Sequence, residues 1–91
     1  MEGFIELITH TGEEFSPRVK DIQAIGSRDD ENGYEQSFIV YHNKVIYIDE
    51  FYWDIWKSLK QAGASITCRA HLSKADLDSF MKHFSGTESG Q

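Results

Sequence analysis

The sequence has little of what metal, disulfide or cofactor chemistry needs. It contains one cysteine, Cys68, so no intrachain disulfide forms, which fits a reducing compartment. There is no C-x-x-C or H-x-x-x-H pair, although zinc sites usually take two ligands from one close-spaced pair. We therefore expect neither a metal nor a cofactor. The histidines are scattered and predicted to lie on the surface: His10, His42, His71 and His83.

Long apolar runs are also absent. No stretch approaches the roughly 20 apolar residues that a membrane-spanning helix needs. The start, Met1-Glu2-Gly3-Phe4, lacks the basic residues and apolar run of a signal peptide. We expect a cytoplasmic protein with no membrane partner.

Basic residues are in deficit, at 9 against 15 acidic ones, which gives a net charge of −6. Binding to nucleic acid or to an anionic membrane depends on lysine and arginine, so this balance disfavours direct contact with either. A basic protein partner remains open, as does the simpler reading that the charge only keeps the protein soluble.

Catalytic motifs are missing as well. The sequence has no G-x-S-x-G elbow and no glycine-rich phosphate loop. Cys68 and His71 are three residues apart on a predicted strand, so their side chains should face opposite sides. The acidic groups at 29–31 and 49–50 have structural explanations, in a turn and at a helix start. We therefore predict that the protein is not an enzyme, and no catalytic residue is assigned.

The sequence does contain short β-forming segments with turn residues between them. We predict a first strand over 4–8, a turn at 11–14 and a short extended piece from Phe15 that ends near Pro17. Three-residue spacing of apolar residues over 19–25 indicates one helical turn that leads into a strand. Asn32-Gly33 is a strong hairpin signal.

The segments 37–41 and 45–48 predict the best-defined hairpin. Phe38 and Val40 point to one face, whereas Ile39 and Tyr41 point to the other, and residues 45–48 alternate in the same way. A strand that is apolar on both faces is normally covered on both faces.

Two helices are predicted in the second half of the chain. The first covers about 49–62, with Asp49 as its cap and Gly63 as its stop. A strand follows over 64–71, with Ile66, Cys68 and Ala70 facing inward. Ser73 then opens the second helix, over about 73–84, whose apolar stripe ends at residue 84.

Together these elements predict an α+β fold, with a small antiparallel sheet of four to five strands packed against two helices. Residues 1–84 form one domain, and the small polar residues 85–91 form a disordered tail. The two helices are expected to cover one face, which leaves the other to residues 15–25 or to a second protein. The predicted buried residues are Ile39, Val40, Ile46, Ile48, Ile55, Leu59, Ile66, Leu77 and Phe80.

One pattern of apolar and turn residues runs through the first two-thirds of the chain: Ile5, Leu7, Gly12, Phe15, Ile22, Ile25, Phe38, Val40, Lys44, Ile46, Ile48, Glu50, Ile55 and Leu59. In this pattern the chain resembles the small bacterial FlbD-like family, named for flagellar operons. The resemblance covers about 4–60, implies a fold only, and brings no catalytic residues. The chain departs from the family pattern at the acidic loop 29–33, in the aromatic-rich helix and after Gly63.

Trp53 is the strongest candidate for a contact residue. On the predicted helix it lies beyond the apolar arc, on the polar face near Lys57, where a tryptophan is either a lone exposed aromatic or an interface anchor. Tyr52, at the edge of the arc, is expected to extend this patch. The acidic hairpin residues Asp29, Asp30 and Glu31 form a second candidate.

These features predict a small regulatory or protein-binding module that binds a protein partner or forms a homodimer. The alternative is an acidic inhibitor of a bacterial mobile element or phage, in which the carboxylates imitate nucleic acid. A small-ligand binder or an enzyme that uses the histidines is the third hypothesis.

Overall fold

The two-faced hairpin predicted over 37–48 forms the centre of the fold. Strands β4 (Glu35–Tyr41) and β5 (Lys44–Ile48) pair in antiparallel fashion from Ser37↔Ile48 to Tyr41↔Lys44. Two residues join them, His42 and Asn43, and both have positive φ, at 52° and 65°. Such a turn matches the right-handed twist of paired strands.

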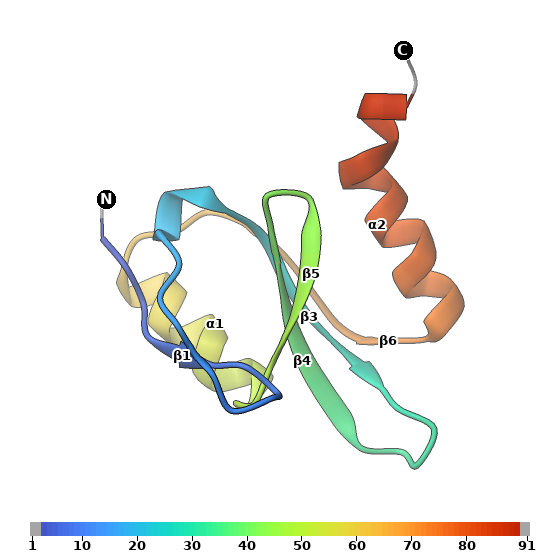
Figure 1. Cartoon of the computed structure of the whole chain (residues 1–91), viewed down its shortest axis with the longest axis horizontal. Coiled ribbons are helices and arrows are strands. Elements are labelled where there is room, and N and C mark those ends of the chain that lie inside the picture. The colour runs from blue at the N-terminus through green and yellow to red at the C-terminus, as the bar shows by residue number, and fades with distance from the viewer. Residues whose placement is uncertain (1–2, 90–91) are drawn as a thin grey trace.

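The computed structural model describes residues 3–89, and the side chains of residues 3–82 (Figure 1). The α+β prediction is confirmed: a four-stranded sheet, a two-stranded sheet and two α-helices make up this part of the chain. The elements are β1 (Leu7–Ile8), β2 (Glu14–Phe15), the 3-10 turn η1 (Val19–Asp21), β3 (Ile22–Asp29), β4, β5, α1 (Tyr52–Gln61), β6 (Thr67–Leu72) and α2 (Lys74–Ser89). The predicted helical turn before β3 is thus present.

The larger sheet has the strand order β5-β4-β3-β6. Strands β3 and β4 are antiparallel, but β6 pairs with β3 in parallel, from Ala24↔Thr67 to Arg28↔Leu72. The prediction of a wholly antiparallel sheet is therefore wrong at this one pair. The chain leaves β5 at one edge, passes through α1 and returns at the opposite edge, which sets the direction of β6.

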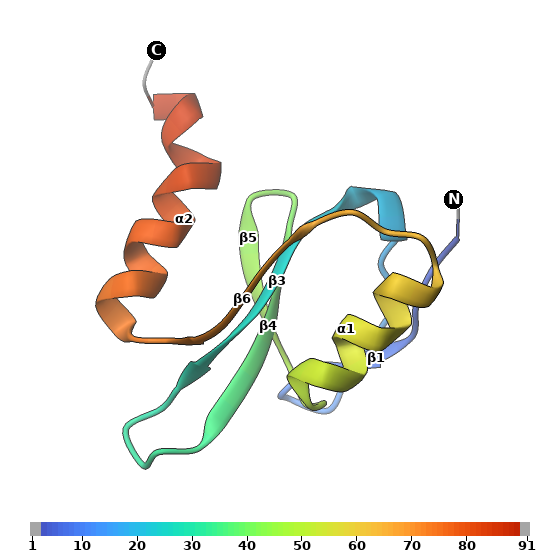
Figure 2. The ribbon, with the colours of Figure 1, turned by 180° about the vertical axis from the view of Figure 1, so that it is seen from behind.

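Each face of the sheet is covered by its own layer, with α1 and α2 on opposite sides (Figures 1 and 2). One core cluster joins Ile25, Ile39 and Ile48 to the buried residues of α1. The other joins Phe38 and Val40 to Leu77 of α2. The prediction of two covered faces is confirmed, whereas the placement of both helices on one face is wrong. Within the described residues, each face of the larger sheet therefore packs against a layer of the same chain.

Most residues predicted to be buried lie in these clusters. Ile39, Val40, Ile48, Ile55, Leu59 and Leu77 are at most 6% exposed. Ile46, Ile66 and Phe80 are half-buried and pack against the clusters.

The N-terminal segment closes the free edge of β5. The first strand is shorter than predicted, at Leu7–Ile8, and pairs with β2. Beyond it, the His10 backbone N–H donates to the Tyr47 carbonyl at 3.0 Å, and Asp49 N–H donates to the Ile8 carbonyl at 2.7 Å. These bonds bring residues 8–10 beside the end of β5, next to the start of α1.

Helix α1 begins three residues later than predicted. Its N-cap is Phe51, which makes no side-chain cap hydrogen bond, so the prediction that Asp49 caps the helix is wrong. The predicted C-terminal stop is confirmed, because Gly63 has φ 82° and the Ala64 N–H donates back to the Leu59 carbonyl at 2.9 Å.

Helix α2 begins as predicted and ends later. The Asp76 N–H donates to the Ser73 hydroxyl at 3.1 Å, which is the predicted cap. The helical backbone runs to Ser89 rather than 84, so most of the segment predicted as a disordered tail is helical. The predictions for the side chains of residues 83 and 84, and for 90–91, fall outside the described residues.

Strand β6 carries a bulge that changes which of its side chains point into the core. Ile66 and Cys68 pack against the α1 cluster, as predicted. A register shift between Gly26 and Arg28 then adds one residue to β6, so Ala70 is exposed, against prediction, and Leu72 packs on the α2 side. Neither of the described helices has the length and apolar character to cross a membrane.

Candidate functional site

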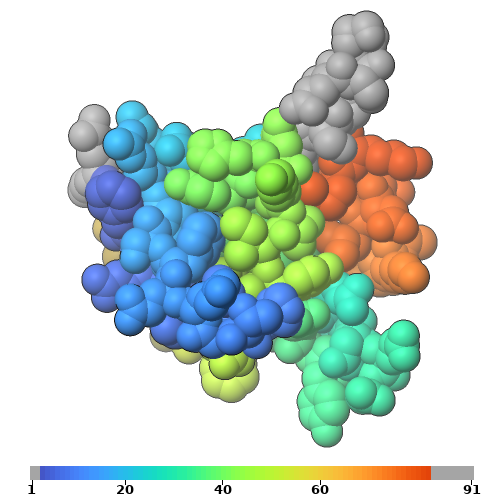
Figure 3. Space-filling view, viewed as in Figure 1, coloured from blue at the N-terminus to red at the C-terminus, as the bar shows by residue number. Residues whose placement is uncertain are grey.

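The main cleft of the described residues lies between the β3–β4 hairpin and the start of α1. Its volume is about 520 Å³. The hairpin tip, in teal, projects away from the body of the molecule in Figure 3, which leaves this side open. The lining residues are His10, Asp30, Glu35, Gln36, Ser37, Ile48, Asp49, Glu50, Phe51 and Asp54.

The cleft is strongly acidic. Five of its lining residues are carboxylates and none is lysine or arginine, so His10 is the only lining side chain that can carry a positive charge. Carboxylates gathered around one concave surface reinforce one another's potential and attract cations. This charge exceeds what the hairpin acids alone had indicated, because two separate stretches of the chain, 30–35 and 49–54, contribute to it.

Some of these carboxylates accept hydrogen bonds that stabilise the local fold, and others accept none. A Glu50 carboxylate oxygen accepts the Ile8 N–H at 3.2 Å, and an Asp30 oxygen accepts two N–H groups of its own turn. Within the described part of the chain, the side chains of Asp49 and Asp54 form no hydrogen bond or ion pair. Since Asp49 does not cap α1, the structural explanation of its charge no longer holds.

Phe51 stands at the rim of the cleft with 76% of its surface exposed. It occupies the N-cap of α1, where serine, threonine, aspartate or asparagine would satisfy a free N–H. It therefore neither caps the helix nor fills the core. Phe51 was not predicted as a contact residue, because the helix was expected to begin at Asp49, which would place Phe51 inside it.

The aromatic residues of α1 divide between surface and core. Trp53 is 58% exposed, as predicted, and its ring packs edge-on against Tyr52 and Trp56 with centroids 5.1 and 5.6 Å away. Tyr52 is only 3% exposed, so the prediction that it extends the surface patch is wrong. Lys57 is exposed, as predicted, but neither Lys57 nor Trp53 lines the cleft.

The predicted acidic loop residues have different positions. Asp30 lines the cleft. The predicted turn at Asn32-Gly33 is present, and the Gly33 N–H closes it by donating to the Asp30 carbonyl. Glu31 is exposed at the hairpin tip. Asp29 points instead toward β6, where it meets His71. The structure thus joins one of the three loop acids to the start of α1.

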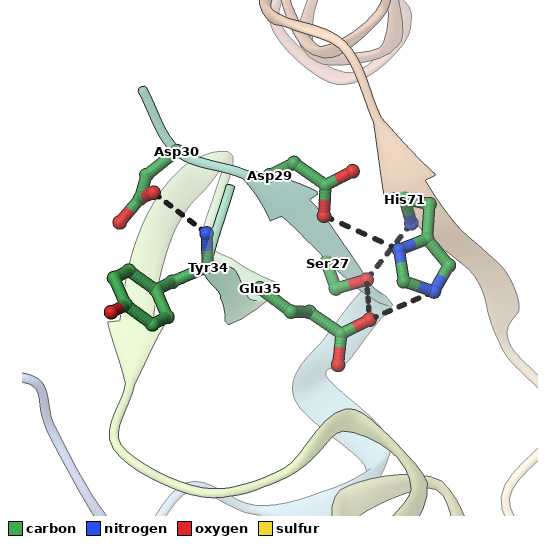
Figure 4. A network of polar contacts seen from close by, with 6 residues as sticks. All are labelled: Ser27, Asp29, Asp30, Tyr34, Glu35 and His71. Carbon is green, nitrogen blue, oxygen red and sulfur yellow. Dashed lines mark hydrogen bonds and ion pairs between the residues drawn. The ribbon is translucent and has the colours of Figure 1, made fainter. Parts of the chain in front are cut away.

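His71, predicted to be an ordinary surface histidine, is the hub of a polar network (Figure 4). Its ring lies between Asp29, at 3.3 Å, and Glu35, at 3.1 Å. The Ser27 hydroxyl donates to Glu35 at 3.0 Å and accepts the His71 backbone N–H at 2.9 Å. No sequence signal brings together residues separated by 44 positions.

This network does not have the geometry of a catalytic triad or of a metal site. The Ser27 side chain is fully buried, and its hydroxyl donates to Glu35 rather than to the imidazole, so serine and histidine are not paired as a catalytic triad requires. The two ring nitrogens of His71 face different carboxylates and do not converge on one point. Among the described residues, no group of three or more histidine, cysteine or acidic side chains could hold a metal ion.

Among the described residues, Tyr52 is the group whose pKa is clearly shifted. Burial, together with smaller contributions from the neighbouring Cys68 thiol and from Glu35, raises the pKa of its phenol to about 12. Because the shift comes from core packing, Tyr52 serves the stability of α1 rather than proton transfer at neutral pH.

Tyr52 should make the protein sensitive to alkali. In the unfolded chain the phenol ionises near its ordinary value of 10.0, whereas the folded protein keeps the proton to about 12. Between these values the unfolded state binds fewer protons, so the free energy of unfolding should fall by about 1.4 kcal/mol per pH unit. Below pH 10 this contribution is complete. Urea unfolding between pH 9 and 11.5 measures it.

The control is Tyr34→Phe, at a side chain that is 71% exposed. Tyr52→Phe should flatten the alkaline fall, and Tyr34→Phe should not. Equal slopes in wild type and Tyr52→Phe would show that another group is responsible.

Comparison with known proteins identifies no relative. No protein-family model matches the chain, and no curated protein or solved structure matches it significantly. The resemblance of residues 4–60 to the FlbD-like family stays a prediction.

Proposed function

We propose that the protein is a non-enzymatic binding module that holds a basic segment of a partner protein in the acidic cleft, with Phe51 as an apolar anchor at its rim. One observation carries the proposal: five carboxylates line the cleft without a lysine or arginine among them. A partner with arginine or lysine side chains complements this charge, and an exposed aromatic residue supplies the apolar contact typical of hot spots. The single free thiol supports action in the cytoplasm.

The local sequence around Phe51 supports the proposal. A phenylalanine at an N-cap supplies no side-chain acceptor for the free N–H groups of the helix, which lowers the stability of the free protein. Departures of this kind from local preference occur where function overrides folding.

The alternative, an acidic inhibitor that imitates nucleic acid, has less support. A mimic needs its carboxylates spread along a surface, whereas here they gather around one cleft. Asp29 and Glu35 are also paired with His71, which makes them less available to a partner. The main argument for self-association was an uncovered sheet face. Both faces are covered within the chain, so this argument no longer holds.

Binding of two labelled peptides tests the proposal. One is rich in arginine and carries a single tryptophan, and the other has glutamate in place of each arginine. We expect saturable fluorescence anisotropy with the first and none with the second. The double variant Asp49→Asn/Asp54→Asn should weaken binding about tenfold, which is about 1.4 kcal/mol, because both carboxylates are free of structural bonds.

The matched control is Asp76→Asn/Asp78→Asn on α2, which changes the net charge by the same amount outside the cleft. It should change the affinity less than about twofold. Equal losses in the two double variants would mean that the peptide responds to overall charge, and the proposal would be wrong.

Phe51→Ser should separate stability from binding. A serine at position 51 would form with Asp54 the same cap that Ser73 forms with Asp76, which should raise the free energy of unfolding by about 1 kcal/mol. Loss of the exposed ring should weaken peptide binding about tenfold. Urea unfolding and anisotropy measure the two effects. Phe4→Ser, which removes another exposed ring outside the cleft, is the control and should leave binding unchanged.

A further inference from the structure

His71 is held in an unusual backbone conformation at the bulge of β6. Its φ is 58°, in the left-handed region that non-glycine residues rarely adopt. The buried Ser27 hydroxyl fixes it there by accepting its N–H at 2.9 Å. Backbone outliers of this kind cluster at functional sites.

The position places the imidazole between two carboxylates, one from each of the strands that lead into the hairpin. One ring nitrogen lies 3.3 Å from Asp29, at the end of β3, and the other lies 3.1 Å from Glu35, at the start of β4 (Figure 4). Both contacts become charge-assisted when the ring is protonated. They are the only ion pairs within the described part of the chain.

Glu35 belongs to two sites at once. The Glu35 oxygen that faces His71 also accepts the Ser27 hydroxyl, and Glu35 lines the acidic cleft. We infer that His71 regulates the acidic cleft: its protonation neutralises Glu35 and lowers the affinity of the cleft for a basic partner segment, so that binding strengthens as the pH rises through the range in which imidazoles titrate. This inference rests on the proposed function.

The direction of the effect follows from the charges around the ring. Imidazoles gain their proton near pH 6.5, whereas carboxylates stay ionised well below that pH. Asp29 and Glu35 are the charged groups that contact His71. Arg69 and Lys74, the nearest cations in sequence, form no ion pair within the described residues. Acidification therefore adds positive charge beside the cleft.

A second imidazole faces the cleft directly. His10 lines it and packs edge-on against Tyr47 at a centroid distance of 5.8 Å. Its protonation also opposes a basic ligand, so the two histidines must be separated by substitution. His71 is distinguished by its direct contact with a cleft carboxylate.

The experiment measures the affinity of the arginine-rich peptide at pH 8 and at pH 5.5 by anisotropy. Wild type should bind about tenfold more weakly at the lower pH. His71→Asn should reduce this difference to less than about threefold, since asparagine tolerates the left-handed conformation and keeps the backbone N–H but carries no charge. His10→Asn should retain most of the difference. Circular dichroism verifies folding at both pH values.

A second variant and a second readout keep the test independent of how His71→Asn folds. Glu35→Gln retains an acceptor for Ser27 but removes the shared charge, so it should flatten the pH dependence in the same way. Peptide binding and ring protonation affect each other equally. Saturating peptide should therefore lower the pH midpoint of the His71 ring titration, followed by NMR, by the base-ten logarithm of the fold-change in peptide affinity.

The outcomes separate this inference from the proposed function. Peptide binding with a pH dependence that neither His71→Asn nor Glu35→Gln reduces would overturn the role of His71 and leave the cleft as a binding site. A pH dependence that disappears only in His10→Asn would do the same. Absence of peptide binding at both pH values would overturn both proposals.

Discussion

Phe38→Ala is expected to lower the free energy of unfolding by about 4 kcal/mol. The Phe38 ring is fully buried on the α2 side of the sheet and contacts the rings of Tyr47 and Phe80, with centroids 6.3 and 6.2 Å away. The cluster around it contains few other buried side chains, so little can move in to fill the cavity. Urea unfolding measures the loss.

The same substitution should loosen α2 more than α1, because Phe38 packs on the α2 face alone. Hydrogen exchange should therefore accelerate along Lys74–Ser89 before it does along Tyr52–Gln61. Phe51→Ala, which removes an exposed ring, is the control and should change the stability little. A loss below about 1 kcal/mol for Phe38→Ala would contradict the two-layered core.

Gly26→Ala is expected to cost about 3 kcal/mol, near the upper end of what overpacking produces. A β-carbon at this position would lie 2.5 Å from the Arg69 carbonyl oxygen and 2.5 Å from the tip of the Phe38 ring. The carbonyl belongs to the backbone of β6, so the parallel strand pair would have to separate to make room. The missing side chain of Gly26 therefore permits the close approach of β3 to β6.

Gly33→Ala provides the contrast. Gly33 has φ +84° and open space around its Cα, so alanine there meets conformational strain without a clash, worth about 1 kcal/mol. Urea unfolding of both variants should rank Gly26→Ala well above Gly33→Ala. The reverse order would show that the parallel pair of β3 and β6 is not as close as described.

The parts of the fold that were predictable from sequence are those that local residues decide. Alternation of apolar residues set the facing of β4 and β5, and Gly63 and Ser73 marked a helix end and a helix start. The direction of β6 was not predictable, because the same alternation suits parallel and antiparallel neighbours. The sheet face on which α2 packs depends on the direction of β6 and on the bulge before Leu72, so it was not predictable either.

The candidate site was predictable only in fragments. Asp30 was identified from its charge and its turn, but the partners that complete the cleft come from distant segments. Asp49 was assigned to helix capping because acidic residues before an apolar arc usually cap, and the true start at Tyr52 left it free. The contact between His71 and Glu35 depends on β6 lying next to β3, which only the tertiary structure establishes.

The central claim, that the acidic cleft is the binding surface, is tested most directly by an NMR titration of the isotopically labelled protein with the arginine-rich peptide. The backbone amides of residues that line the cleft, above all Asp49, Phe51 and Asp54, should shift in a saturable manner, and those of α2 should stay in place. Saturable shifts that instead centre on α2 or on the outer edge of β6, or none at all, would contradict the account.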